Sequence, residues 1–273
     1  MIVIDSVYIH CGGGLILLNT LLDELENRAI KIVHLRDDRN STHLDSARDV
    51  EVNGNRFLSR LKFYSVNRNK IDRVLCFGNI PPPLSIQGDV FVYFHQRLLL
   101  EDNLDLLQKL KLLVIKALSG KTDKWLVQTE SMKSLLERRL VKGRGKIQLM
   151  PFYSELPIDE GTATKSTYLY VSSGAPHKNH MRLLNAFKRF SVLYPESKLI
   201  LTIEDNNDEL LNRMTELKND GVSIDNYTRL NRTGISKLLC HSEYVIYPSL
   251  SESFGLGLIE ACQALKPILA SDY

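Results

Sequence analysis

The sequence predicts an α/β protein built from two doubly wound parallel-sheet domains. Short β-branched and aromatic runs alternate with stretches of helical apolar spacing along the chain, which is the pattern of strands followed by crossover helices. A stretch at 151–167 with two prolines, one glycine and several Ser and Thr residues reads as a linker. Because 273 residues can bury two cores, we expect a first domain at 1–155 and a second at 156–273.

In the first domain, six apolar runs are expected to form strands. Helices are expected where leucines follow Gly14, over 101–118, and after a cap at Ser131. The segment from Asp37 to Asn55 shows no clear period, so we expect a polar loop there. The predicted strands are 1–9, 29–34, 73–77, 90–94, 124–128 and 147–150.

Two features of the first domain are candidates for binding. A glycine-rich turn at Gly12, Gly13 and Gly14 follows the first strand, and it permits a close approach to a phosphate or an acceptor, although a simple tight connection explains it equally well. The strand at 90–94 delivers His95 to its carboxyl end, which is where open α/β sheets bind ligands. A lone histidine at such a place is also common for structural reasons.

The second domain is expected to contain about five strands, and the stretch from Tyr247 to Ala261 is its most informative part. A buried strand ends at Tyr247 and Pro248, and helical spacing begins near Phe254. Gly255 and Gly257 therefore lie where a helix begins, and its first amides have no partner within the helix. Such a terminus binds anions, and the glycines remove side chains that would keep a diphosphate away.

Two carboxylates and one ammonium accompany this turn. Glu252 precedes the helix and Glu260 lies in its second turn, so they are expected to serve different hydroxyl groups. A carboxylate accepts from both hydroxyls of a diol, which suits Glu260 for a ribose and Glu252 for a transferred sugar. Lys178 stands near another helix start, after the strand at 168–171, and can add point charge beside a diphosphate. Surface glutamates and a surface lysine are the simpler alternative.

Two strings in the second domain carry a resemblance. The string Pro-Ser-x-x-Glu-Ser-Phe-Gly-Leu-x-Leu-x-Glu-Ala at Pro248 to Ala261 resembles the donor-site signature of retaining glycosyltransferases of family 4, also called glycosyltransferase group 1. Pro-x-Lys-Asn-His at Pro176 to His180 resembles a second motif of the same family. The resemblance implies the GT-B fold, in which two Rossmann-like domains face a cleft. It covers almost the whole chain, but the family continues beyond Tyr273, so we expect a C-terminally truncated second domain.

The resemblance also implies roles for individual residues. The second domain would hold a UDP- or GDP-linked sugar as substrate, with no further cofactor, and the first domain would lie on the acceptor side. Many family members place an arginine five or six positions before the motif lysine, whereas this chain has Ser172 and Ser173 there. The implied catalytic residues are His95, Glu252 and Lys178, and the implied donor-binding residues are Gly13, Gly14, Lys178, Glu252, Phe254, Gly255, Leu256 and Glu260.

The implied activity is that of a retaining hexosyltransferase. The E-x7-E spacing of Glu252 and Glu260 fits this class, and the acceptor would be a glycan or lipid-linked molecule, as in polysaccharide biosynthesis. Two alternatives stay open. A GT-B sugar-nucleotide epimerase would consume the donor without an acceptor. A non-catalytic fragment or subunit of a split glycosyltransferase would need a second polypeptide to complete the second domain.

The amino-acid composition indicates the cellular compartment and the kinds of partner that we expect. Four scattered cysteines, without a Cys-x-x-Cys pair, favour a reducing cytoplasm and no metal site. Residues 1–155 carry 23 Lys and Arg against 18 Asp and Glu, while 156–273 carry 12 against 14. The basic first half, and above all a cluster from Lys133 to Lys146, suits an anionic acceptor or peripheral contact with the inner membrane face, or simply a solvated surface. Nucleic acid is not expected, because no aromatic residues interleave with these charges.

Overall fold

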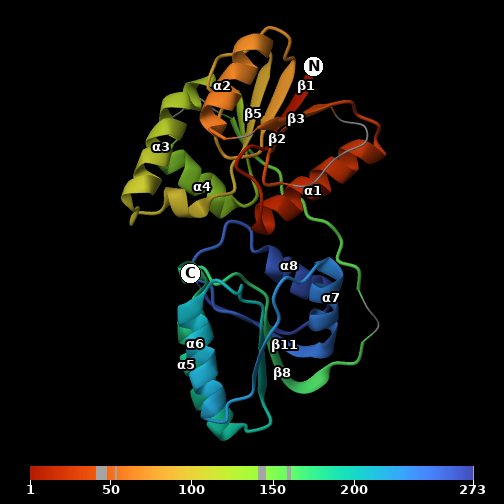
Figure 1. Ribbon diagram of the computed structural model, residues 1–273, viewed down its shortest axis with the longest axis vertical. Helices are drawn as coiled ribbons and strands as arrows, with labels where there is room; N and C mark the ends of the chain where they lie inside the picture. Colours follow the sequence, from red (N-terminus) through yellow and green to blue (C-terminus); the bar gives the residue numbers. More distant parts are fainter. Residues whose placement is uncertain (41–47, 53, 141–145, 159–160, 273) are drawn as a thin grey trace. The chain divides into compact units, whose positions relative to one another are not determined.

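The computed structural model describes residues 1–40, 48–52, 54–140, 146–158 and 161–272. The chain divides into two compact units, Met1–Ser154 and Glu155–Tyr273, called unit 1 and unit 2 below. Each unit is built on one parallel sheet with helices on both of its faces (Figure 1). None of the described helices is long and apolar enough to cross a lipid bilayer.

Unit 1 has a seven-stranded sheet in the order β3-β2-β1-β4-β5-β6-β7. Its strands are β1 (Ile2–Asp5), β2 (Val33–Asp37), β3 (Arg48–Val52), β4 (Arg73–Cys76), β5 (Asp89–Tyr93), β6 (Lys124–Val127) and β7 (Lys146–Leu149). Its helices are α1 (Gly12–Asn27), α2 (Arg56–Asn67), α3 (Leu106–Leu118) and α4 (Glu130–Arg139), with short 3₁₀ turns η1 (Arg97–Leu100) and η2 (Ser119–Lys121).

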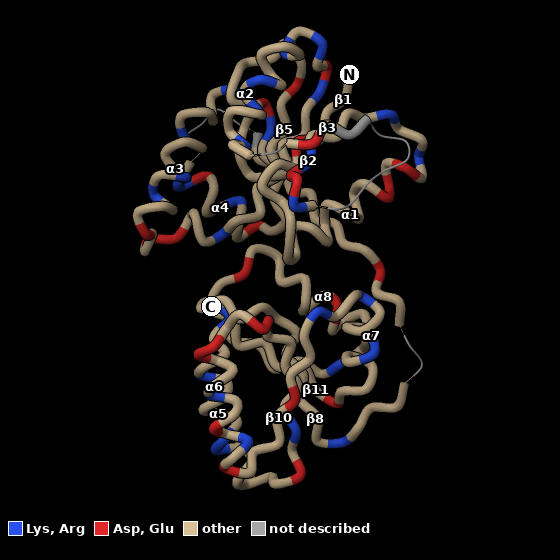
Figure 2. The backbone as a smooth tube through the Cα atoms, in the orientation of Figure 1, with Lys and Arg blue, Asp and Glu red and all other residues tan. Residues whose placement is uncertain are grey.

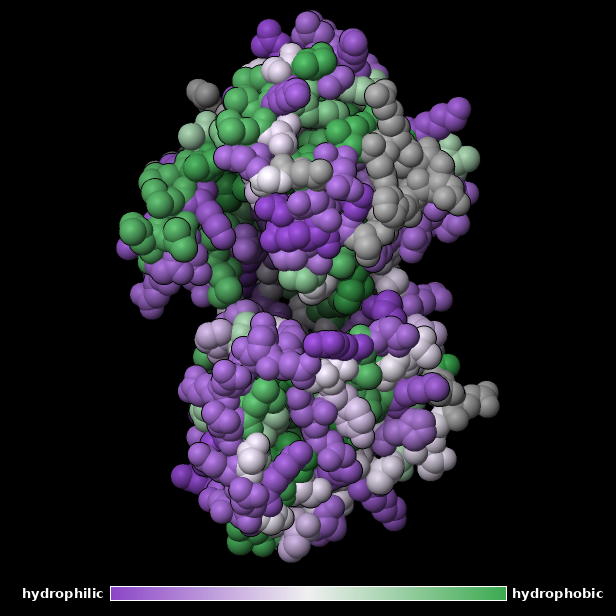
Figure 3. All heavy atoms as spheres, in the orientation of Figure 1, coloured by the Kyte–Doolittle hydropathy of each residue, from purple (hydrophilic) through white to green (hydrophobic). Residues whose placement is uncertain are grey.

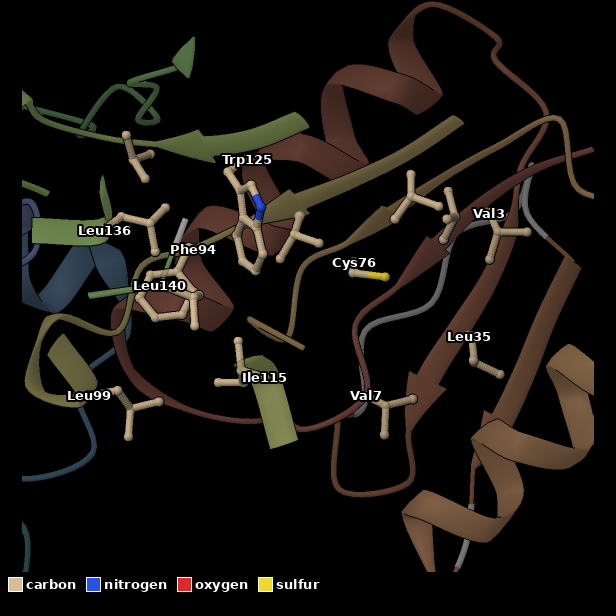
Figure 4. Close-up of a cluster of buried hydrophobic side chains, with 14 of the residues drawn as sticks. Val3, Val7, Leu35, Cys76, Phe94, Leu99, Ile115, Trp125, Leu136 and Leu140 are labelled. Atoms are coloured by element: carbon tan, nitrogen blue, oxygen red, sulfur yellow. The ribbon is translucent and has the colours of Figure 1, made fainter. Parts of the chain in front are cut away.

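The pleat of the sheet divides the apolar residues of unit 1 between two cores. Adjacent residues of β1 point to opposite faces, so Val3 joins the core under α2, α3 and α4 while Ile4 joins the core under α1. In register, Val3 lies opposite Val74 and Ile4 opposite Leu75. The first core holds Trp125 and Phe94 beside residues of β1, β2 and β4 (Figure 4). Helices on both faces make this sheet doubly wound.

Unit 2 has a five-stranded sheet in the order β10-β9-β8-β11-β12. Helices α5 and α6 cover one face, and α7 and α8 cover the other (Figure 1). The strands are β8 (Thr164–Tyr170), β9 (Lys198–Leu201), β10 (Ile224–Asn226), β11 (Ser242–Tyr247) and β12 (Ile268–Ala270). The helices are α5 (His180–Leu193), α6 (Asp208–Asn219), α7 (Arg232–His241) and α8 (Leu256–Gln263), with a 3₁₀ turn η3 (Pro176–Lys178) before α5.

Side-chain caps begin five of the eight α-helices in the described chain, and three begin without one. A cap matters because the first amides of a helix have no acceptor within it. The side chains of Asn55, Asp105, Thr129, Asn207 and Asn231 accept hydrogen bonds at the starts of α2, α3, α4, α6 and α7. The uncapped helices are α1, α5 and α8, which follow β1, β8 and β11. All three begin at the carboxyl edge of a sheet.

The structure corrects several expectations about local elements. The expected polar loop from Asp37 to Asn55 contains the edge strand β3, whose Glu51 pairs with Arg36 of β2 at 2.6 Å. Thr129, and not Ser131, caps α4. Gly12, Gly13 and Gly14 form the first turn of α1 instead of a separate loop. Part of the basic cluster, Lys142 and Arg144, lies outside the described residues.

Of the four cysteines, Cys11 and Cys262 are exposed, while Cys76 and Cys240 are buried. All four are free thiols in the structure.

Candidate functional site

The carboxyl edge between β8 and β11 forms the centre of the candidate site in unit 2. These strands are neighbours, yet α5 leads from β8 to β9 on one side and α8 leads from β11 to β12 on the other. The loops after β8 and β11 therefore diverge from one point, which is where open α/β sheets bind ligands. The two loops are joined by a hydrogen bond from the Leu250 amide to the His177 carbonyl, 2.8 Å, and by one from Asn179 Nδ2 to the Pro248 carbonyl, 3.1 Å.

Tyr170, the last residue of β8, contacts both the loop after β8 and the loop after β11. Its ring is buried, and its hydroxyl donates to the Lys178 carbonyl at 3.0 Å and lies 2.9 Å from Ser249 Oγ. One side chain thus fixes the backbone before α5 to the backbone after β11. Tyr170 was not among the predicted site residues, and its only signal in the sequence is a tyrosine at the carboxyl end of a predicted strand.

Lys178 and Glu252 form an ion pair between the same two loops. The Nζ atom of Lys178 lies 2.5 Å from Oε1 of Glu252, and the two side chains are 17% and 12% exposed. Each residue comes from one of the two diverging loops, so the fold brings together two of the three residues predicted to be catalytic. The pair is largely buried, with a small exposed fraction on each side chain, at the carboxyl edge of the sheet.

Glu260 forms a second ion pair, deeper in unit 2. It lies in α8 and is 4% exposed, and its Oε1 accepts from Arg232 Nη1 at 2.9 Å. Burial raises the pKa of the Glu260 carboxyl, and the Arg232 guanidinium opposes this shift. Arg232 also donates to the Glu155 carbonyl at 3.4 Å. Another arginine, Arg229 in the loop before α7, pairs with Asp205 on the exposed surface, 3.2 Å apart.

The start of α8 lies in the loop that carries Glu252. Gly255 is its N-cap residue, with φ +73°, a left-handed conformation that strains any residue with a Cβ atom. No side chain caps this helix, so the amides of Leu256 and Gly257 are presented to the edge of the sheet. A Cβ atom on Gly257 would lie 3.1 Å from the Tyr247 ring, so this glycine allows α8 to pack closely against β11. Phe254 is half-buried beside the turn.

The loop after β8 is held by polar groups at the positions where the family resemblance leads one to expect an arginine. The Ser172 amide donates to Thr202 Oγ1 at 3.0 Å, and its hydroxyl donates to the Ser173 carbonyl at 3.2 Å. The Gly174 amide donates to Glu204 Oε2 at 2.9 Å. The serines thus shape the loop and bring no positive charge to it.

In unit 1, the predicted residues gather at the corresponding edge of the other sheet. A Cβ atom on Gly14 would lie 3.1 Å from His95 Nε2, whereas one on Gly13 would meet no atom within 4 Å. The His95 amide donates to Asn79 Oδ1 at 2.7 Å, and Asn79 adopts φ +67° in the loop after β4. Burial lowers the pKa of His95 to about 4, so its imidazole is neutral at pH 7.

A buried ion pair that sequence analysis missed anchors the loops around this edge. Asp5 ends β1 and accepts from Arg60 Nη2 at 2.8 Å and from the Tyr64 hydroxyl at 2.8 Å. Arg60 also donates to the Ile80 carbonyl at 3.0 Å, which ties the loop after β4 to β1. Asp5 and Arg60 are 1% and 2% exposed. Their separation of 55 positions left no signal in the sequence.

The predicted site residues therefore form two groups. Gly13, Gly14 and His95 belong to unit 1, and the others belong to unit 2. Within unit 2, the structure brings Lys178 into contact with Glu252 and places Phe254, Gly255 and Leu256 in the turn that follows Glu252. Glu260 forms a separate ion pair with Arg232.

Comparisons with known proteins agree with the fold. The chain aligns with sucrose-phosphate synthase (tll1590) from Thermosynechococcus elongatus at a TM-score of 0.76 and 16% identity, covering 98% of this chain and 80% of that one. It aligns with WaaG, a glycosyltransferase involved in lipopolysaccharide biosynthesis, at a TM-score of 0.72 and 15% identity, covering 99% and 80%. The pneumococcal O-GlcNAc transferase GtfA, in complex with UDP and GlcNAc, gives a TM-score of 0.60 and 17% identity.

The coverage differs among these structures. The alignment with GtfA takes in 78% of this chain but only 44% of GtfA. A comparison with curated protein sequences found no match. A family model described as "Glycosyl transferases group 1" matches residues 156–273, which are nearly all of unit 2. The chain therefore has the α/β fold of the GT-B glycosyltransferases, with two Rossmann-like units, and its unit 2 matches the glycosyl transferases of group 1.

Proposed function

We propose that this chain is a retaining hexosyltransferase of glycosyltransferase family 4, which moves a sugar from a UDP- or GDP-linked donor to a glycan or lipid-linked acceptor. The observation that carries the proposal is the contact of Lys178 with Glu252, 2.5 Å apart, beside the uncapped start of α8. One ammonium, the uncapped amides of Leu256 and Gly257 and one carboxylate at a topological switch point suit a diphosphate joined to a sugar. The match of residues 156–273 to group 1 supports the same function.

Donor binding would use this charge arrangement directly. The diphosphate would lie against the amides of Leu256 and Gly257, with Lys178 Nζ as a point charge beside it. As the ammonium turns from Glu252 to the diphosphate, the Glu252 carboxylate becomes available to accept from hydroxyls of the sugar. The same groups would stabilise the charge that grows on the departing diphosphate during transfer. No metal ion is needed in this scheme, because the ammonium and the amides carry that charge.

Glu260 would bind the ribose. Its carboxylate is buried and is fixed by Arg232 from one side, which leaves one oxygen, Oε2, for hydroxyl groups. The guanidinium favours the ionised form of the buried carboxyl, in which Oε2 is an acceptor for the hydroxyls of the ribose.

Unit 1 would serve the acceptor and the transferred sugar. His95 is neutral at pH 7 and lies against Gly14, so its ring can exchange hydrogen bonds with a sugar hydroxyl near the glycine turn. Retention fits a front-side displacement in which the leaving phosphate accepts the acceptor proton. A cytoplasmic site of action is part of the same proposal, and the four free thiols support it.

Calorimetry and turnover test the proposal together. UDP, GDP, UDP-glucose and GDP-mannose are titrated into the chain, and release of nucleoside diphosphate is measured with and without a glycan acceptor. We expect binding of one nucleotide class, its loss in Lys178→Ala, and a loss of sugar-dependent affinity and of turnover in Glu252→Ala. Retained binding and turnover in both variants would overturn the site assignment.

The same assay separates the alternatives. Release of nucleoside diphosphate that needs no acceptor, with an epimerised sugar, identifies an epimerase. Binding without turnover of any donor, restored by a second polypeptide, identifies a subunit of a split transferase.

A further inference from the structure

Helix α3 exposes an apolar surface that the proposed activity does not use. Its outer residues are mostly leucines, and space-filling atoms of apolar residues gather over this helix at the left of unit 1 (Figure 3). Only Ile115 is fully buried, at 1%, and Leu112 packs against the same core. The exposed residues are Leu106 at 73%, Leu107 at 69%, Leu110 at 51%, Leu113 at 61% and Val114 at 44%.

The five exposed residues form one continuous face, called the α3 face below. At 100° per residue they fall within an arc of about 120°, and Ile115 lies on the opposite side. The contrast with α2 is informative. It also exposes three apolar residues, Phe57, Leu58 and Val66, but these are spread over about 180° and make no stripe. Of these two helices, only α3 therefore carries its exposed apolar residues as one continuous stripe.

Lysines border the α3 face on both sides. Lys109 and Lys116 fall along one margin of the arc and Lys111 along the other, and all three are exposed. Helix α3 contains no acidic residue, and the basic segments along it are visible in Figure 2. Among the ion pairs of the described residues, none involves these three lysines.

The basic residues of the neighbouring helix α4 are partly engaged in ion pairs, so they are less available for an external anionic partner than the sequence suggested. In the predicted basic cluster, Lys133 lies 3.7 Å from Glu130, and Arg139 pairs with Asp102. These contacts within unit 1 partly neutralise α4. The lysines of α3 are thus better placed than those of α4 to meet an anionic surface.

We propose that the α3 face is a docking surface for an anionic lipid bilayer, on which α3 lies parallel to the membrane plane. The apolar arc would enter the boundary between headgroups and acyl chains, and the lysine stems would extend so that their ammonium groups reach lipid phosphates. A second copy of this chain is a poorer occupant, because two α3 faces in contact would bring six lysines together. The surface lies in unit 1, and it acts independently of the donor site in unit 2.

Vesicle flotation with the full chain tests the apolar part. Vesicles contain equal parts phosphatidylglycerol and phosphatidylcholine, or phosphatidylcholine alone. We expect the wild type to bind the anionic vesicles, and Leu107→Ser/Leu113→Ser to lower the partition coefficient at least about tenfold. The matched control is Leu58→Ser/Val66→Ser on α2, whose residues are 56% and 67% exposed, and it should bind as the wild type does.

A second pair of variants tests the charge. Lys109→Gln/Lys111→Gln/Lys116→Gln should lower binding to anionic vesicles about a hundredfold, since each basic residue near such a surface contributes about a fivefold factor. Lys31→Gln/Lys62→Gln/Lys70→Gln removes the same net charge from exposed positions of unit 1 and should have little effect. Circular dichroism checks that every variant is folded.

Three outcomes would overturn the proposal. One is a folded wild type that does not bind anionic vesicles. Another is equal losses in the α3 variants and their controls. The third is a chain that sediments as a dimer without vesicles and becomes a monomer in Leu107→Ser/Leu113→Ser, which would make a second copy the occupant. Donor titration into the same variants should stay unchanged, so failure here is distinct from failure of the donor site.

Discussion

Lys178 Nζ lies 2.5 Å from Glu252 Oε1, although the two residues are 74 positions apart in the chain. Tyr170 makes this contact possible, because its hydroxyl bonds to the backbone carrying Lys178 and to Ser249 in the loop that carries Glu252. A substitution of either residue therefore also changes the electrostatic surroundings of the other residue's charge. An unpaired carboxylate near a diphosphate repels it, and an unpaired ammonium attracts it.

A double-mutant cycle on this pair is the first test. Lys178→Met should weaken donor binding by about a hundredfold, since it removes a charge-assisted contact and takes the Lys178 ammonium away from the Glu252 carboxylate beside the diphosphate. Adding Glu252→Gln should recover part of that loss, and calorimetry measures the coupling. Lys188→Met is the control, because Lys188 forms an exposed pair with Asp220 in the same unit, 2.7 Å apart. A double variant that binds no better than Lys178→Met would contradict the coupling.

Gly255→Ala tests the backbone of the donor turn. The left-handed φ of +73° costs a residue with a Cβ atom roughly 1–2 kcal/mol, and the new atom would lie 3.1 Å from Leu258 Cδ1. We expect α8 to shift at its start, with a loss of donor affinity larger than the loss of stability. Gly120→Ala is the control, since Gly120 lies in η2 of unit 1, where a Cβ atom would meet nothing within 4 Å. Equal donor affinity in Gly255→Ala and wild type would argue against contact between the turn and the diphosphate.

The pH dependence of donor binding reports on Glu260. Burial raises the pKa of this carboxyl above its ordinary value, so it becomes protonated at a higher pH than an exposed glutamate does. We expect donor affinity to fall as the pH drops through this raised pKa. Arg232→Gln removes the cation that opposes the shift, so its affinity should begin to fall at a higher pH. Calorimetric titrations at a series of pH values measure this, and Arg229→Gln, which breaks only an exposed pair with Asp205, should follow the wild type.

The strands were predictable where they are buried. Runs such as Val90 to Phe94 are continuous and β-branched or aromatic, and the structure places β5 there. The edge strand β3 was missed because it is polar and is specified by its partner β2, to which Arg36 and Glu51 contribute a cross-strand pair. Helix α6 was also missed, although Asn207 caps it and its apolar residues are regularly spaced.

The candidate site was predictable only where residues lie close in sequence or in a motif. The two strings around Lys178 and Glu252 lead to the prediction that both bind the donor, but only the sheet order explains why they touch. The pairing of Glu260 with Arg232 depends on how α7 packs beside α8, and the sequence does not encode that in a local pattern. The Asp5–Arg60 pair is similar, since its members meet through the tertiary fold.

Breaking the Asp5–Arg60 pair should destabilise unit 1 strongly. Arg60→Met leaves a carboxylate buried without its cation, which costs about 3–5 kcal/mol of unfolding free energy. Asp5→Asn/Arg60→Met removes both charges and should cost clearly less. The fluorescence of Trp125, the only tryptophan of the chain, follows unfolding of unit 1 in urea. Arg28→Met is the control, because its exposed pair with Glu24 should contribute less than about 1 kcal/mol.

His180 should make the stability of unit 2 depend on pH. Its ring is 2% exposed, lies 4.8 Å from the Tyr170 ring, and has no hydrogen-bond partner on either nitrogen among the described residues. Burial, with a smaller effect from Lys178, lowers its pKa to about 4 from an ordinary 6.5. Between these values the unfolded chain binds the proton more strongly than the folded chain does. Stability should therefore fall by about 3 kcal/mol as the pH drops from 6.5 to 4.

His180→Phe isolates this contribution, because it keeps an aromatic ring against Tyr170 and removes the titrating group. The difference in unfolding free energy between variant and wild type, followed by circular dichroism in urea, should grow in favour of the variant below pH 6.5. Trp125 fluorescence reports unit 1 and should show no such change between the two proteins. A difference that stays constant from pH 7 to pH 4.5 would mean that His180 titrates normally and that its ring is reached by water.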